Sequence, residues 1–187
     1  MTIGDTLEAP SNCWTTNEQF FVDALIASTA FQEIVEAGAG PGTIAEKTTK
    51  HVFLEEVTRS GTNYTHAELE QLRHYAIVTS ANDDGYTLVL ANTKNHETTG
   101  QVRLIIRRLV RDSEWMENGR HIPMRWFKNR VGDFMDGLQE YSEGAGGPIM
   151  QTINVDFGPR ETKETEQPTQ GFWLTCALSI EWAFNIE

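Results

Sequence analysis

The stretch that decides the fold closes the chain: GFWLTCALSIEWAFNIE, residues 171–187. Every even position from 172 to 186 is apolar, and the odd positions between them are mostly small or polar. Apolar residues at every second position predict a β-strand with one buried face. The run is roughly two to three times as long as an ordinary strand. We therefore expect it to organise the sheet of the protein.

The length of this strand poses a geometric problem. At about 3.3 Å per residue it runs to about 50 Å, whereas a compact domain of 187 residues is about 40 Å across. The strand must either curve through a bulge within its own domain or extend beyond it. An unpaired extension would attract another strand, so pairing within an oligomer is one solution. The sequence leaves both alternatives open.

The rest of the chain alternates between helical and extended patterns. Apolar spacing predicts an amphipathic helix over 17–37, opened by a capping box at Thr16 and Gln19, and a second helix over 123–143. A shorter helix is expected near 66–73, after a capping box at Thr65 and Glu68. The apolar stripe of the second long helix consists of Phe127, Val131, Phe134, Leu138 and Tyr141. Strands are predicted at 51–57, 75–81, 86–91, 101–110 and 149–158.

These elements predict the fold class. The strands at 75–81, 86–91 and 101–110 should form an antiparallel meander around a turn at 82–85, and the last two strands a hairpin with a long charged tip at 159–171. Gly132 and Gly137 should mark a close approach of the second helix to another backbone. After an irregular lead at 1–14, we expect one α+β domain over 1–187. It should have two layers, a mostly antiparallel sheet covered on one side by two amphipathic helices.

Composition excludes several classes of protein. The 15 basic and 27 acidic residues give a net charge of −12, which argues against a protein that wraps nucleic acid. No stretch approaches the roughly 18 apolar residues of a membrane span, and the N-terminus does not resemble a signal peptide. Cys13 and Cys176 have no metal-ligand spacing and fit a reducing compartment. The five histidines form no known catalytic or metal motif, so we expect no enzyme, no metal and no cofactor.

One basic stripe stands out in this acidic chain. Arg103, Arg107 and Arg111 fall on one face of the strand at 101–110. They could contact an acidic neighbouring subunit, or they could pair across the sheet with residues such as Glu181 or Glu56. Both interpretations remain open from the sequence.

The order of elements resembles the tail terminator, or tail-completion, proteins of long-tailed bacteriophages. The similar stretches are TTNEQFFVDALIASTAFQEIV (15–35), FKNRVGDFMDGLQEY (127–141) and FWLTCALSIEWAFNIE (172–187). The resemblance implies a structural virion protein of the neck, assembled in the host cytoplasm. It further implies a homo-hexameric ring that caps the tail tube protein and joins it to the head-completion or stopper protein, while DNA passes through the lumen without specific binding.

A ring subunit of this kind needs interface residues. The candidates are Arg103, Arg107, Arg111, Trp173, Glu181, Asn95, His96, Arg160 and Lys163. A head–tail joining or stopper protein of the same neck is an alternative. A different class of alternative is a small-ligand-binding α+β module, with a pocket lined by Trp115, Trp126, Trp173 and Trp182.

Overall fold

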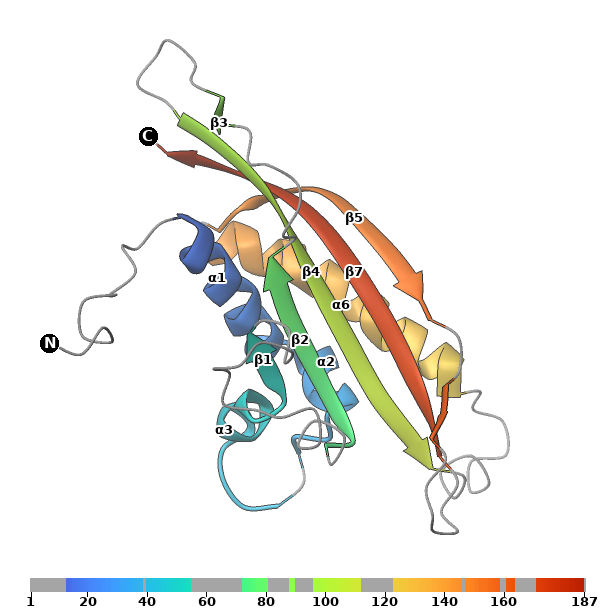
Figure 1. Cartoon of the computed structure of the whole chain (residues 1–187). Helices are drawn as coiled ribbons and strands as arrows, with labels where there is room; N and C mark the ends of the chain where they lie inside the picture. The colour runs from blue at the N-terminus through green and yellow to red at the C-terminus, as the bar shows by residue number, and fades with distance from the viewer. Residues whose placement is uncertain are drawn as a thin grey trace, which may run out of the picture.

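A computed structural model describes residues 13–38, 40–54, 72–80, 88–89, 96–111, 123–145, 147–158, 161–163 and 171–186 (Figure 1). The helices are α1 (Cys13–Ala27), α2 (Thr29–Ile34), α3 (Ile44–Thr49) and α6 (Pro123–Ala145). The strands are β1 (Val52–Leu54), β2 (His74–Ser80), β3 (Leu88–Val89), β4 (His96–Arg111), β5 (Ile149–Phe157), β6 (Glu161–Lys163) and β7 (Gly171–Ile186).

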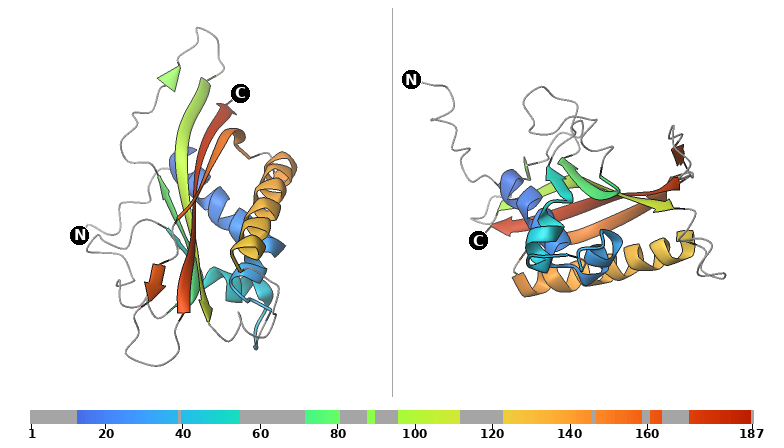
Figure 2. Two further views of the ribbon diagram at one scale, coloured as in Figure 1. Left: turned by 90° about the vertical axis from the view of Figure 1, so that its right-hand side faces the viewer. Right: turned by 90° about the horizontal axis from the view of Figure 1, so that it is seen from below.

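The strands form one mixed sheet in the order β1-β2-β4-β7-β5. β1 pairs with β2 in parallel, and all other pairings between the described strands are antiparallel. The helices lie together on one face of the sheet, as both views of Figure 2 show. The predicted fold class is therefore confirmed: an α+β arrangement of two layers, with a mostly antiparallel sheet covered on one side.

The closing strand is paired along its whole length. β4 and β7 each have 16 residues, and their register is continuous from Arg111 opposite Gly171 to His96 opposite Ile186. Figure 1 shows the two strands running side by side and projecting beyond β2 at the end where β4 begins. β7 thus continues past Ala183, where its pairing with β5 begins, and β4 of the same chain pairs with it as far as Ile186.

β4 is longer than the predicted strand at 101–110, because it begins at His96 in the polar stretch between this strand and the predicted strand at 86–91. Pairing with β7 extends this polar stretch as a strand. Gly100 lies opposite Trp182, and a Cβ atom on Gly100 would come within 2.5 Å of the indole ring. Only glycine leaves room for the ring to lie across β4 here, which explains a residue that otherwise weakens strands.

The core lies between the sheet and the helices. The alternate positions of β4 and β7 that point toward the helices are buried, among them Leu104, Ile106, Leu178 and Ile180. Four members of the predicted stripe of α6 are buried as well: Phe127, Val131, Phe134 and Leu138. The prediction for Gly132 and Gly137 is wrong, because a Cβ atom at either position would meet nothing within 4 Å.

The predicted helix at 17–37 is two helices. α1 already begins at Cys13, so Thr16 and Gln19 lie inside it and cannot form a capping box. The helix is interrupted at Ser28, whose backbone is extended (φ −71°, ψ 118°). The Ser28 hydroxyl accepts a hydrogen bond from Phe31 N at 3.3 Å. A serine that caps its own new helix ends the preceding one.

The predicted meander is also wrong in its order. β2 and β3 both pair with β4, β2 at 102–108 and β3 at 97–98, so β3 does not lie between them. The reason is the length of β4, which offers its first residues to β3 and its later residues to β2. β1 covers part of the predicted strand 51–57 and β6 part of the predicted loop 159–171. The turn at 82–85 and residues 66–71 of the short predicted helix lie outside the described residues, and residues 72 and 73 are not helical.

Candidate interface on the outer face of the sheet

The outer face of the sheet, the face opposite the helices, carries four of the predicted interface residues. Strand alternation places Arg103 and Arg107 of β4 there, together with Trp173 and Glu181 of β7. The odd positions of β7 between these two are Thr175, Ala177 and Ser179. Because these side chains are small, they project only a short distance from the middle of β7. Another surface can therefore approach the backbone closely there.

Arg107 is integrated into this face by three neighbours. Its Nε donates a hydrogen bond to Thr175 Oγ1 at 3.3 Å, and its Nη1 donates to the Tyr75 hydroxyl at 3.2 Å. Its guanidinium lies over the Trp173 ring, 5.2 Å from the centroid. Arg107 therefore contacts a hydroxyl, a phenol and an indole of neighbouring strands, as the cross-strand alternative expects for this residue.

Arg107 sits at the border of a small aromatic cluster, which we call the outer cluster: Phe53, Tyr75 and Trp173. The Tyr75 and Trp173 rings meet edge to face with centroids 5.9 Å apart, and Tyr75 meets Phe53 at 6.3 Å. All three residues are buried. The outer cluster fixes Arg107 and Trp173 in place, so this end of the outer face is a rigid surface.

Arg103 and Glu181 behave differently from Arg107. Arg103 is exposed and lies between Thr79 and Ser179, whereas Glu181, also exposed, lies opposite Gln101. Within the described part of the chain no ion pair joins Arg103 to Glu181. The two charges stand as diagonal neighbours on one face, which leaves the contact interpretation open for them. Glu56 lies outside the described residues.

The remaining predicted interface residues fall at the two ends of the β4–β7 ribbon. Arg111 of β4 and Lys163 of β6 both lie opposite Gly171, on either side of β7, so the fold brings them to the same level. His96 lies at the opposite end, across from Ile186. The side chains of these three residues are outside the described part of the structure, as are Asn95 and Arg160 altogether.

The tryptophans do not gather around one pocket in the part of the chain that is described. Trp182 lies in the main core, Trp173 belongs to the outer cluster, and Trp126 of α6 packs under the Arg108 guanidinium, 4.6 Å from the ring centroid. Trp115 is outside the described residues. The ligand-binding alternative would therefore need a cavity elsewhere.

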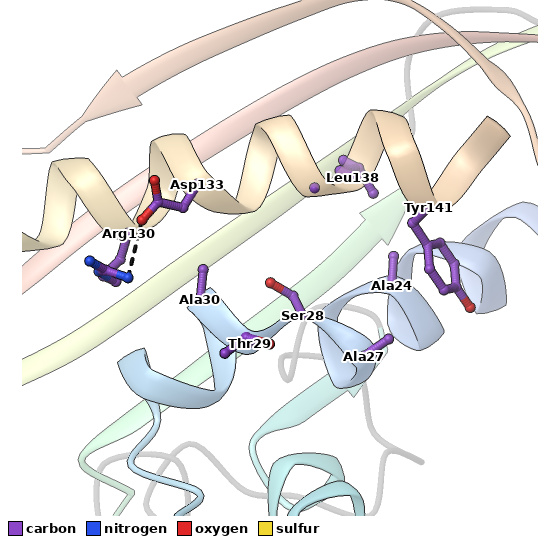
Figure 3. Close-up of a pocket in the computed structure, with 10 residues that line it drawn as sticks. Ala24, Ala27, Ser28, Thr29, Ala30, Arg130, Asp133, Leu138 and Tyr141 are labelled. Carbon is purple, nitrogen blue, oxygen red and sulfur yellow. Dashed lines mark ion pairs between the residues drawn. The ribbon is translucent and has the colours of Figure 1, made fainter. Parts of the chain in front are cut away.

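Such a cavity lies between the α1–α2 break and α6, on the far side of the helices from the sheet (Figure 3). Its volume is about 330 Å³, and its lining is mostly small, including Ala24, Ala27 and Gly137. At its charged end, Arg130 Nη1 lies 3.1 Å from Asp133 and 3.2 Å from Glu33, whereas the buried Arg130 Nε has no hydrogen-bond partner among the described residues. The described lining offers a shallow groove with no convergent set of free polar groups, which ligand sites usually have.

Sequence reasoning missed a polar cluster that joins α2 to the sheet. Arg108, on the helix side of β4, donates to the α2 carbonyl of Ile34 at 2.6 Å and forms an ion pair with Glu36 at 2.8 Å. Glu36 itself has a positive φ of 58°, a conformation that ends a helix. The guanidinium thus occupies the carbonyl end of α2, where a positive charge is favourable. An arginine that directly follows Arg107 of the basic stripe gives no sequence signal for this role.

His74 of β2 completes the cluster. Its side chain is 6% exposed, and its Nε2 lies 3.5 Å from Glu36 Oε2. Its backbone carbonyl meets His51 Nδ1 at 2.7 Å. Burial, and then the neighbouring Arg108, lower the pKa of His74 to about 4, although Glu36 acts in the opposite direction. The imidazole is therefore neutral at physiological pH. We interpret the cluster as a contact that holds α2 against the sheet.

The described residues contain no group of three His, Cys, Asp or Glu side chains that could hold a metal ion. None of the described helices combines the length and the apolar character needed to cross a membrane. A comparison of the sequence with known protein families finds no match, and a comparison with curated proteins finds none either.

Proposed function

We propose that the chain is a structural protein of the neck of a long-tailed bacteriophage, where copies of it form a ring that caps the tail tube and joins it to the head-completion complex. The observation that carries this proposal is the β4–β7 ribbon, which is 16 residues long in both strands. A ribbon of this length, with helices on one face and the small residues Thr175, Ala177 and Ser179 in the middle of the other, suits a subunit that presents a long wall to its surroundings.

The net charge of −12 supports the same proposal. DNA that moves through the lumen of a ring must not bind to the wall, and an acidic wall repels the phosphate backbone. The hexameric stoichiometry rests on the resemblance to tail terminators. Arg103 is the exposed cation of the outer face with no ion pair among the described residues, so we assign it to contact with an acidic surface of a neck partner.

Immunogold labelling of virions from the phage that encodes the chain tests the location. Label confined to the junction between head and tail supports a neck protein, and intact virions without label refute the proposal. Deletion of the gene separates the two neck roles. Loss of a terminator should give tail tubes of excess length, whereas loss of a joining or stopper protein should leave tails of normal length beside unjoined heads.

Charge reversal tests the role of the outer face. Arg103→Glu should reduce the yield of joined particles by about tenfold or more, because a like-charge contact costs well above the 1.4 kcal/mol that corresponds to tenfold. The matched control is Arg125→Glu, the same charge change at an exposed position on α6. Equal yields from the two variants would remove the outer face from the interface.

A further inference from the structure

The two edges of the sheet carry exposed apolar side chains. In the described chain β1 is the strand at one edge and β5 the strand at the other. The large apolar residues that are exposed lie on or beside these edges: Leu54 of β1 (44% exposed), Val155 and Ile149 of β5 (37% and 57%), and Ile44 of the adjacent α3 (49%). Apolar side chains at a strand edge favour pairing with a further strand.

Leu54 and Val155 lie on the same face of the sheet. Leu54 is opposite Val78, and Val155 is opposite Leu178, and both partners are buried on the helix side. Directly paired residues of adjacent strands share a face. If β5 of one copy lay beside β1 of another in a continuous sheet, these two side chains would meet on the helix side and extend the core across the seam.

The strand directions also fit this pairing. β1 runs parallel to β2, and three antiparallel steps, from β2 to β4, from β4 to β7 and from β7 to β5, make β5 antiparallel to β1. A copy placed next to the first with its sheet in the same orientation would therefore pair β5 with β1 in the antiparallel sense, which the more stable ladder geometry favours.

The proposed ring, and not charge, favours this arrangement over a two-fold pairing of β5 with itself. The α6 helix exposes both signs of charge, Arg125 and Lys128 as well as Asp136 and Glu140. Lys128 is the charged residue of α6 that lies against β5, with its Nζ 4.9 Å from the centroid of the Phe157 ring.

We propose that the chain associates with itself head to tail, with the β5 edge of one copy against the β1 edge of the next. This inference rests on the proposed ring and names its interface. A contact between two different surfaces repeats around a closed ring, which a two-fold contact cannot do. The bulge between Met150 and Thr152 limits the seam to the later part of β5, and β1 has three residues, so the seam is short.

Cross-linking between introduced cysteines tests the seam. In a Cys13→Ser background, the remaining native Cys176 is buried. The variants Leu54→Cys and Val155→Cys are treated with a short bis-maleimide separately, as a mixture, and combined in one chain. We expect no covalent dimers from either single variant, dimers from the mixture, and a ladder of higher oligomers from the double variant. Asn129→Cys, exposed on α6, replaces Val155→Cys in the control mixture and should give no dimers.

Other results overturn the inference. Dimers from Val155→Cys alone would indicate the two-fold contact, and rings without any cross-link would indicate another interface. A second variant, Val155→Lys, should stay folded by circular dichroism and should self-associate at least about tenfold more weakly than the native chain. Unchanged self-association would refute the contact between β5 and β1. Neck labelling without cross-links would leave the proposed function standing and reject the seam, whereas a ladder without neck labelling would do the reverse.

Discussion

The buried His74 predicts a loss of stability in mild acid. Its ring is almost fully enclosed, and among the described residues no group forms a hydrogen bond with its Nδ1. Protonation would place a cation in this site beside Arg108, with only Glu36 to compensate. His51, packed against the carbonyl of His74, adds to the unfavourable field. The folded chain therefore resists a proton that the unfolded chain accepts.

The magnitude follows from the two pKa values. The pKa of His74 falls from 6.5 to about 4 on folding. A group whose pKa is lowered in the folded state contributes its full stabilisation above the unfolded pKa and loses it as the pH falls toward the folded pKa. Between pH 7 and pH 5 this single group should remove about 2 kcal/mol from the free energy of unfolding, and about 3 kcal/mol by pH 4.

Urea unfolding followed by circular dichroism at pH 7, 6 and 5 measures this loss. With a dependence on urea of about 2 kcal/mol per molar, the midpoint of the native chain should fall by about 1 M more than that of His74→Gln between pH 7 and 5. His51→Gln, which keeps His74, is the control and should retain most of the acid loss. The reasoning fails if His74→Gln loses as much stability as the native chain over this range.

Two further predictions concern the β4–β7 ribbon. Gly100→Ala should destabilise the fold by about 1–3 kcal/mol in urea unfolding, because the new methyl group overlaps the Trp182 ring; Gly132→Ala, an open helical position, should instead be neutral or stabilising. Burial raises the pKa of the Cys176 thiol to about 12. In the Cys13→Ser variant, the Cys176 thiol should not react with a thiol reagent near neutral pH until urea is added. Rapid reaction of the folded variant would contradict the position of Cys176 in the core.

The parts of the fold that the sequence predicts well are those in which one face is buried over many residues. Among the residues whose burial is described, β7 buries every even position from Leu174 to Trp182, and α6 buries Phe127, Val131, Phe134 and Leu138. The period of two and the period of 3.6 therefore appear clearly in the sequence. Local pattern and tertiary packing agree at these elements. Their positions were predicted to within about two residues, which is the usual uncertainty of element boundaries.

The parts that the sequence does not predict depend on contacts between distant residues. The stretch from His96 to Gly100 has the composition of a loop and becomes a strand because β7 pairs with it. Ser28 fits the apolar spacing of a helix as a small residue, yet its hydroxyl begins a new helix there. Arg108 looks like a member of the basic stripe, but strand alternation turns it to the helix side, where it binds the end of α2. Similarly, the position of a glycine within α6 does not reveal whether a neighbour is close.

The lengths of the strands differ between the middle and the edges of the sheet, which bears on the proposed self-association. The two 16-residue strands, β4 and β7, lie inside the sheet and pair with each other along their whole length. The edge strands are shorter, with three residues in β1 and nine in β5, which contains a bulge. Short and bulged edges are how sheets limit uncontrolled pairing. At these edges Leu54 and Val155 are exposed on the same face of the sheet. In the proposed head-to-tail contact, the long ribbon would organise the sheet within one copy, and the short edges would restrict association to one register with the next copy.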